Sequence, residues 1–316
     1  MGERIVIRVP NWVGDAVIST ALLPILRRNF PRATISILAH PRVKEIFLYN
    51  PHIDAIQVLG ERIEADMGIL LTNSFSSAWN FFISGIKKRI GYATDGRKFL
   101  LTHPIPLPEG WKELPQMEYY LGILAFMGLK IGEEVKGEIY LDPEEKEKVK
   151  SRFSLPSRFI ALFPGSAYGS SKRWAVERFG EVSLRMGKEF GWKTFILGGE
   201  EEKGLGEIIR TINPQVVDLT GKTTLREAMA ITSLASLAVT NDSGAMHIAS
   251  VLGTPLVAIF GPTPLEKTRP RQGNFRILKK KISCSPCSFR VCPYEHECML
   301  RISVDEVMEK IREVVD

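Results

Sequence analysis

Short apolar runs alternate with longer segments of helical periodicity along most of the chain. The first run, residues 4–9, leads through a turn at 10–14 into a helical pattern over 15–29. Strands that alternate with helices form parallel sheets covered by helices on both faces, so the pattern predicts an α/β fold. A Pro-rich stretch at 101–111 predicts a loop, and a helix is predicted around 117–127. Further strands are predicted at 33–39, 55–59 and 67–71.

The same alternation starts again after a charged segment at 143–152, which predicts a solvated helix at a domain junction. We therefore place one domain at 1–142 and a second at 143–316, with the last helix a candidate to pack back on the first domain. The second domain has predicted strands at 158–163, 193–197, 216–219, 237–240 and 255–260, and predicted helices at 175–190, 204–212, 225–233 and 247–252. Two doubly wound, Rossmann-like units predict a ligand cleft between the carboxyl ends of their sheets.

Composition supports a globular protein with two cores. A chain of 316 residues is longer than one domain of ordinary size. Of these residues, 44% are hydrophobic and 25% charged, as in globular proteins. No apolar run reaches the length of a membrane span, and residues 1–9 resemble a strand and not a signal peptide, so we expect a cytoplasmic protein. The net charge of +6 favours anionic partners without choosing among nucleotides, nucleic acid and acidic membranes. A random surplus on a solvated surface would look the same.

The clearest candidate for ligand chemistry follows the strand at 237–240. Asp242, Ser243 and Gly244 end this strand, and a helix begins at once with His247 in its first turn. The free N–H groups and the dipole of a first helical turn attract an anion. Alternatively, Asp242 or Ser243 simply caps the helix and Gly244 makes a tight turn. These two interpretations are compatible, and the segment alone weighs them evenly.

A second candidate is the loop at 163–174, which also joins a strand to a helix. It offers small residues, among them Ser166 and Ser171, beside the cations Lys172 and Arg173. Small residues allow the backbone to contact phosphate oxygens, and Lys172 can neutralise a diphosphate as a point charge. The spacing is not that of a Walker motif. Composition alone favours the alternative of a solvated surface loop.

The third candidate is Gly14-Asp15, at the start of the helical pattern after the first strand. Composition alone favours a turn and a helix cap. In a catalytic interpretation, Asp15 is a general base that deprotonates a sugar hydroxyl. The helix dipole would keep this carboxylate ionised and make it a weaker base.

These three segments, together with Asn73–Trp79 and Arg89–Thr102, resemble the lipopolysaccharide heptosyltransferases of glycosyltransferase family 9. The resemblance spans nearly the whole chain and is strongest to the heptosyltransferase II branch. It implies a GT-B fold, ADP-heptose as donor, a lipid A-core acceptor, inversion at the anomeric carbon and no required cofactor. It assigns catalytic roles to Asp15, as base, and to Lys172, near the donor phosphates. The substrate-binding positions that it implies are Gly14, Ser166, Ser171, Glu200, Thr223, Asp242, Ser243, Gly244 and His247.

A basic and aromatic stretch is a candidate to meet the acceptor lipid. Lys87–Arg89 and Arg97-Lys98 lie near Trp79, Phe81 and Phe82. Taken with the family, this stretch would receive a phosphorylated, Kdo-bearing lipid at the inner leaflet, with peripheral membrane contact. The residues alone slightly favour a solvated loop with core aromatics.

All four cysteines lie within one short segment, with the spacing C-x2-C-x4-C-x5-C and His296 inside it. This spacing is near that of a metal site, although it differs from the paired C-x2-C motifs of zinc ribbons. Structural zinc, two local disulfides and free thiols all fit, and a structural role is favoured over a catalytic one. The candidate metal ligands are Cys284, Cys287, Cys292 and Cys298.

Two other classes of function compete with heptose transfer. A GT-B transferase for another sugar nucleotide, or an epimerase of related fold, would share these segments, because one sequence does not show which residues select heptose. A non-catalytic nucleotide- or nucleic-acid-binding protein would need stacking motifs or a continuous basic face. The sequence has neither, so we expect no nucleic-acid partner.

Overall fold

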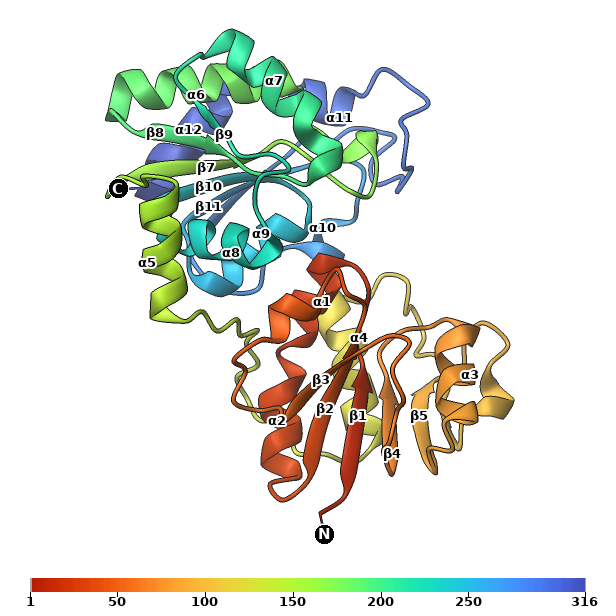
Figure 1. The fold of residues 1–316 in the computed structure, drawn as a ribbon. Helices are drawn as coiled ribbons and strands as arrows, with labels where there is room; N and C mark the ends of the chain where they lie inside the picture. Colours follow the sequence, from red (N-terminus) through yellow and green to blue (C-terminus); the bar gives the residue numbers. More distant parts are fainter. Residues whose placement is uncertain (1, 316) are drawn as a thin grey trace. The chain divides into compact units, whose positions relative to one another are not determined.

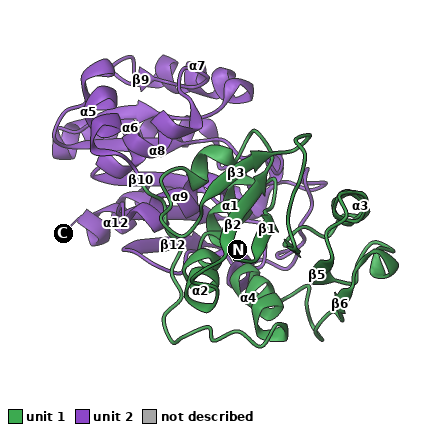
Figure 2. Cartoon of the chain, turned by 60° about the horizontal axis from the view of Figure 1, so that its bottom comes forward, with its two compact units in different colours: residues 1–140 green, residues 141–316 purple. Residues whose placement is uncertain are grey.

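The computed structural model describes residues 2–315, and the chain forms two compact units, residues 1–140 and 141–316 (Figures 1 and 2). Each unit contains a six-stranded sheet in which every neighbouring pair of strands is parallel. The strand order is β3-β2-β1-β4-β5-β6 in the first sheet and β9-β8-β7-β10-β11-β12 in the second. Counted from the start of its own unit, each sheet has the same doubly wound order, which confirms the predicted α/β class.

In the first unit the central strand, β1, lies between β2 and β4. Ile5 of β1 pairs with Ile35 of β2 and with Met67 of β4. The strands are β1 (Arg4–Arg8), β2 (Thr34–Ala39), β3 (Ala55–Val58), β4 (Met67–Leu70), β5 (Lys88–Tyr92) and β6 (His103–Ile105). The helices are α1 (Val13–Ser19), α2 (Leu22–Asn29), α3 (Phe75–Ile83) and α4 (Gln116–Phe126), with the 3-10 turns η1 (Lys44–Phe47) and η2 (Lys98–Leu100).

The single helix predicted over 15–29 is wrong, because the chain breaks between α1 and α2. The hydroxyls of Ser19 and Thr20 donate to the carbonyls of Ala16 and Val17 (2.7 Å each), which competes with helical hydrogen bonding. Pro24, in the first turn of α2, has no N–H to continue the ladder of α1. The break leaves α1 a short helix with Asp15 in its first turn.

The loop predicted at 101–111 is also wrong over its first residues, which form β6. Ile105 O accepts a hydrogen bond from Ala93 N (2.8 Å), and the strand lies at the edge of the sheet. Pro104 is tolerated there because an edge strand needs hydrogen bonds on one side only.

The second unit repeats the same strand order. Its strands are β7 (Phe159–Phe163), β8 (Lys193–Ile196), β9 (Val217–Asp218), β10 (Leu237–Asn241), β11 (Leu256–Phe260) and β12 (Phe275–Lys279). Its helices are α5 (Pro143–Arg152), α6 (Val176–Phe190), α7 (Lys203–Ile212), α8 (Leu225–Leu234), α9 (Gly244–Leu252), α10 (Leu265–Thr268), α11 (Glu297–Leu300) and α12 (Val304–Val315), with the 3-10 turns η3 (Ser170–Lys172) and η4 (Glu200–Glu202).

Alternate residues of the central strands build a core on each face of the second sheet. Ile160 and Leu162 of β7 belong to the core under α6, α7 and α12, whereas Phe159 and Ala161 belong to the core under α5, α8 and α9. All the residues of β7 are buried, as expected for a strand covered on both faces.

The last helix, α12, packs on its own unit, and the expected contact with the first domain stays a prediction. It lies against β11, β12 and α6. Its buried side chains Val304, Val307, Met308, Ile311 and Val314 all belong to the core of the second sheet. The apolar stripe of α12 is therefore fully used within the second unit.

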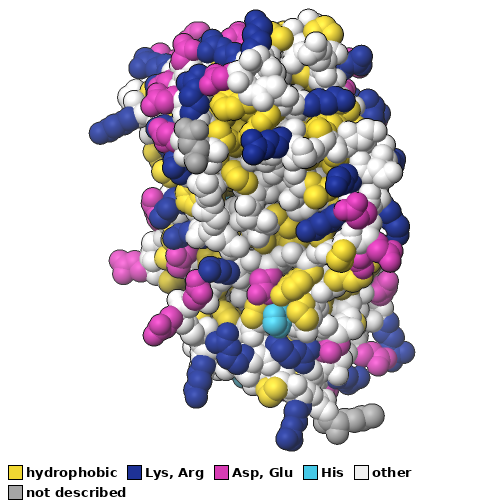
Figure 3. Space-filling model, turned by 90° about the vertical axis from the view of Figure 1, so that its left-hand side faces the viewer, with side chains coloured by type: hydrophobic (Ala, Val, Ile, Leu, Met, Phe, Trp, Pro, Cys, Tyr) yellow, Lys and Arg dark blue, Asp and Glu magenta, His cyan; other side chains and the backbone are white. Residues whose placement is uncertain are grey.

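Charges of both signs are interspersed on the surface. On the face shown in Figure 3, Lys and Arg side chains alternate with Asp and Glu and do not merge into one continuous basic area. Within residues 2–315, no helix combines the length and the apolar composition that a membrane crossing requires.

Candidate functional site

The strand order of each sheet has one switch point, between β1 and β4 in the first unit and between β7 and β10 in the second. At a switch point the loops after two neighbouring strands run to opposite faces of the sheet, which leaves room for a ligand. Asp15 follows β1, Lys172 follows β7 and Asp242 follows β10. The three predicted residues with the strongest chemistry therefore lie at the switch points of their own units.

A buried ion pair forms the centre of the site in the second unit. Lys172 Nζ lies 2.7 Å from Asp242 Oδ2, and the hydroxyl of Thr263 donates to the same oxygen. Both charged side chains are almost fully buried. A buried carboxylate requires compensation of this kind, because removal from water is costly. Lys172 is thus not the solvated surface lysine that composition favoured, and the structure brings two of the predicted residues together.

Two further residues complete this arrangement, and sequence reasoning missed both. Thr263 lies in the loop after β11, and Lys279 is the last residue of β12. The ammonium of Lys279 donates to Thr263 O. Burial lowers the pKa of Lys279, and the charge of Asp242 partly offsets this effect. Lys279 begins a run of three lysines, which in a sequence is typical of a solvated surface.

The start of α9 provides backbone donors beside this ion pair. Ser243 is the N-cap residue, but its side chain makes no capping hydrogen bond, and the carboxylate of Asp242 binds Lys172 and Thr263. The purely structural interpretation, in which one of these side chains caps the helix, is therefore wrong. Gly244 is the first residue of α9 and its backbone is helical, so the tight turn expected at this position is absent.

His247, in the first turn of α9, is buried and electrically neutral at physiological pH. Burial lowers its pKa to about 4; the charge of Lys172 acts in the same direction, and that of Asp242 partly opposes both. A neutral imidazole donates one hydrogen bond and accepts another, so His247 can contact a phosphate or a sugar without adding charge.

The loop that carries Lys172 is fastened to the end of β10. Asn241 Nδ2 donates to Pro164 O (2.8 Å), and Asn241 Oδ1 accepts from Trp174 N (3.0 Å). Asn241 therefore holds both ends of the loop that begins after β7. Ser166 within this loop is buried.

Ser171 has a different position from the one predicted. Its hydroxyl donates to Phe289 O and its backbone N–H donates to Arg290 O (3.1 Å). The side chain is buried, so its hydroxyl fastens the loop and does not face a ligand. The prediction that Ser171 binds substrate therefore gains no support from its side chain and stays a prediction.

Glu200 and Thr223 lie after β8 and β9, and the structure brings their loops together. Gly221 N donates to Gly198 O (3.0 Å), and Glu200 is paired with Lys203. Thr223 immediately precedes Thr224, the N-cap of α8. Both loops follow the carboxyl ends of their strands, as do the loops that carry Lys172 and Asp242. Strands β8 and β9 lie toward the β9 end of the strand order.

In the first unit, Gly14 and Asp15 lie in the first turn of α1. Burial, together with the negative charge of Asp15, raises the pKa of Tyr120 in α4 well above its ordinary value. Arg8, at the end of β1, is buried and donates to Asn11 Oδ1 (2.6 Å). Burial lowers the pKa of Arg8 to about 10. The sequence pattern places Arg8 within the first predicted strand and does not indicate that it is buried.

The basic and aromatic stretch separates into a buried part and an exposed part. Phe81 is in the core, and Arg97 is fully buried, donating to Thr72 O (2.6 Å) and Tyr92 O (2.9 Å). The prediction that Arg97 belongs to a surface lipid site is therefore wrong, because its guanidinium satisfies the backbone between two strands. The exposed side chains of α3 and η2 form a continuous aromatic patch, which consists of Phe75, Trp79, Phe82 and Phe99.

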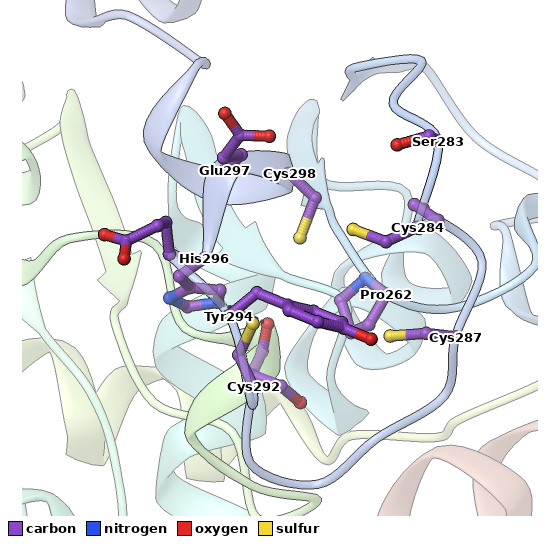
Figure 4. Close-up of a pocket in the computed structure, with 12 residues that line it drawn as sticks. Pro262, Ser283, Cys284, Cys287, Cys292, Tyr294, His296, Glu297 and Cys298 are labelled. Atoms are coloured by element: carbon purple, nitrogen blue, oxygen red, sulfur yellow. Dashed lines mark hydrogen bonds between the residues drawn. The ribbon is translucent and has the colours of Figure 1, made fainter.

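The four cysteines have free thiols and line one hollow (Figure 4). Burial and the other three thiols raise the pKa of Cys298 to about 11. Between residues 2 and 315, no three His, Cys, Asp or Glu side chains already stand in a metal-binding arrangement. The structure therefore does not contain the two disulfides that the sequence left open as one possibility.

Comparison with known proteins gives one consistent family. The model of glycosyltransferase family 9 (heptosyltransferase) matches residues 56–297. Lipooligosaccharide heptosyltransferase 2 of Campylobacter jejuni is 29% identical, over 98% of this chain and 99% of the relative. Lipopolysaccharide heptosyltransferase 2 of Escherichia coli K12 is 28% identical, over 87% of this chain and 88% of the relative.

A solved structure shows the same fold. The structure of E. coli ADP-heptose LPS heptosyltransferase II superimposes with a TM-score of 0.86, at 24% identity, and covers 99% of this chain and 98% of that one. At this identity the likeness concerns the fold, and it confirms the predicted GT-B class with two Rossmann-like units.

Proposed function

The chain belongs to glycosyltransferase family 9, and we propose that it transfers heptose from ADP-heptose to the inner core of lipopolysaccharide, with inversion at the anomeric carbon. The observation that carries this proposal is the buried Lys172–Asp242 pair beside the uncapped start of α9, at the switch point of the second sheet. The relatives named lipooligosaccharide and lipopolysaccharide heptosyltransferase 2 support heptose as the transferred sugar and lipopolysaccharide as the acceptor.

The donor diphosphate is proposed to bind Lys172 and the first turn of α9. A lysine ammonium has three donors, so Lys172 can hold Asp242 with one and still reach a phosphate oxygen with another. The free N–H groups of Gly244 and Ala245 and the helix dipole add attraction for the same anion. These groups are in place before reaction, so they stabilise the charge that develops as ADP leaves.

Asp15 is proposed as the base that activates the acceptor. Its carboxylate takes the proton of a sugar hydroxyl, the hydroxyl oxygen attacks the anomeric carbon from the face opposite ADP, and the bond to the diphosphate breaks. The electron pair of that bond leaves on ADP. The mechanism uses no cofactor.

Asp15→Asn tests the assignment of the base, because it removes the basic oxygen while keeping the shape of the side chain. We expect kcat for heptose transfer to fall by about 10²–10⁴-fold, the usual contribution of a general base. The affinity for ADP, measured by calorimetry, should stay within a factor of about two. Glu118→Gln, at the first turn of α4, is the matched control and should leave both values unchanged. Normal turnover by Asp15→Asn would refute the role of Asp15.

We also propose that the aromatic patch binds the membrane surface in which the acceptor lipid lies. Phe99 is 72% exposed and Trp79 44% exposed. The exposed Lys98 directly precedes Phe99, and the exposed Lys87 lies between the two aromatic residues in sequence. Aromatic side chains flanked by lysines favour the headgroup region of an anionic bilayer.

A further inference from the structure

The hollow at the cysteines collects all four thiols of the protein. It has a volume of about 390 Å³, and its lining includes Tyr294. In Figure 4 the sulfur atoms of Cys284 and Cys298 point toward each other, and those of Cys287 and Cys292 point into the same hollow. The four thiols thus share one interior, although three of them belong to an irregular loop.

Apart from hydrogen bonds to neighbouring segments, this loop has little regular structure of its own. Residues 280–296 contain no helix and no strand. Its largest apolar side chains, Phe289, Val291 and Tyr294, are all exposed. Ordering a residue costs about 1–2 kcal/mol of conformational free energy, and a segment without a core needs a cross-link to offset it.

The chemistry of the hollow selects the kind of cross-link. Four thiolates around one centre are ligands for a thiophilic divalent ion such as Zn²⁺ or Fe²⁺, in tetrahedral geometry. His296 is not available as a ligand through Nε2, because that atom donates to Ser171 O (2.7 Å). The thiols would move inward on binding, which an irregular loop permits.

The same loop holds the segment that carries Lys172. Ser171 N donates to Arg290 O (3.1 Å), and Tyr168 Oη donates to Ser288 O (2.5 Å). Tyr168 in turn places its ring 4.6 Å from the ammonium of Lys172.

It also holds the loop that carries Thr263. The backbone N–H groups of Cys287 and Ser288 both donate to Pro262 O (2.9 Å each), and the hydroxyl of Ser285 donates to Gly261 O (2.8 Å). Both partners of Asp242 therefore lie in segments fastened by the cysteine loop.

We propose that Cys284, Cys287, Cys292 and Cys298 bind one thiophilic divalent metal ion, and that this ion sets the affinity for the donor diphosphate by fixing the segments that carry Lys172 and Thr263. The proposal of the metal site is argued only from the four cysteines and the segment that carries them. Its effect on the donor rests on the proposed function. Binding converts thiols to thiolates and releases their protons to solvent.

Metal analysis of the full chain, purified under anaerobic reducing conditions, tests the site directly. We expect about one equivalent of zinc or iron per chain by mass spectrometry of the elements. Cys287→Ser and Cys292→Ser should each lose most of it. Ser283→Ala, which changes a neighbouring side chain of the same hollow, should retain it. Less than about a tenth of an equivalent in the wild-type protein, or two disulfides found by peptide mapping, would overturn the proposal.

The effect on the donor site is measured on the wild-type chain, which avoids variants that fail to fold. Removal of the metal with a chelator should weaken ADP binding by about tenfold, and addition of Zn²⁺ should restore it. Unchanged ADP affinity after complete removal of the metal would overturn the coupling. Metal content is independent of which sugar nucleotide is used, so a wrong donor assignment would leave this first measurement intact.

Discussion

At the scale of single residues, the proposed donor site depends on the groups that compensate the buried charge of Asp242. Its carboxylate receives Lys172 and Thr263, and Lys279 stands behind Thr263. The sequence indicated Lys172 and Asp242 because both follow apolar strands and precede helices. It could not indicate Thr263 and Lys279, because Thr263 reaches Asp242, and Lys279 reaches Thr263, only when β11 pairs with β10 and β12 pairs with β11.

Lys172→Met should destabilise the protein, because it leaves the Asp242 charge buried with one partner fewer. Loss of one partner of a buried pair costs about 3–5 kcal/mol, measured as the free energy of unfolding in urea. The double variant Lys172→Met/Asp242→Asn removes both charges and should recover most of this stability, while ADP binding stays weak. If the single and double variants were equally unstable, the two residues would not interact as described.

His247 should make stability depend on pH. In the unfolded chain the imidazole takes up a proton below about pH 6.5, whereas in the folded protein burial lowers its pKa to about 4. The unfolded state therefore binds more protons in this interval, so stability is lost as pH falls from 6.5 toward 4, by about 3 kcal/mol.

The measurement compares urea unfolding of wild-type protein and His247→Gln at pH 7 and pH 4.5. Carboxyl groups titrate alike in both proteins, so the difference between the two isolates the histidine. We expect acidification to destabilise the wild-type protein more than the variant. Equal losses in both proteins would show that His247 is not held neutral.

At the scale of elements, the sequence predicted best where local signals agreed. The charged helix predicted at 143–152 is α5, and Asp142 accepts Glu144 N (2.8 Å) while Glu145 reaches back to Asp142 N (3.0 Å). This capping box and the Pro at the first position are signals readable in the chain itself.

Elements defined by tertiary contacts were missed. Strands β6 and β12 lie at the edges of their sheets, and their short, partly polar sequences carry no clear alternation. The break between α1 and α2 depends on side-chain hydrogen bonds of Ser19 and Thr20 within a continuous helical pattern. The hydrophobic periodicity of a sequence indicates which face of an element is buried, but it does not indicate where the element breaks.

The aromatic patch on α3 and η2 should bind anionic bilayers. The double variant Trp79→Ser/Phe99→Ser should bind vesicles of phosphatidylcholine with phosphatidylglycerol about tenfold more weakly than the wild-type protein, because it removes two exposed rings. Phe126→Ser removes an exposed ring of α4 and serves as the control. Pure phosphatidylcholine should bind all three proteins weakly, since electrostatic attraction through the exposed lysines Lys87 and Lys98 requires anionic lipid.

Equal binding to both kinds of vesicle, or no effect of the double variant, would contradict the proposal. In that case the solvated-loop interpretation, which the residues alone slightly favoured, would hold for this surface.

At the scale of the whole molecule, the two units share one strand order and each has its candidate chemistry at its own switch point. The fold could be predicted because two rounds of strand–helix alternation are visible in the chain. The donor could not be predicted from geometry, since a buried lysine and an uncapped helix start would suit any sugar nucleotide. We propose ADP-heptose as the donor because the chain belongs to this family.

The most direct test of the proposed donor and reaction is a transfer assay with a panel of sugar nucleotides and a Kdo-bearing lipid A acceptor. Product is identified by mass spectrometry of the lipid. The account predicts transfer of one heptose from ADP-heptose, with kcat/KM at least about 100-fold higher than for UDP-glucose or ADP-glucose. Transfer of a hexose with equal or greater efficiency, or epimerisation of a sugar nucleotide without any transfer, would contradict it.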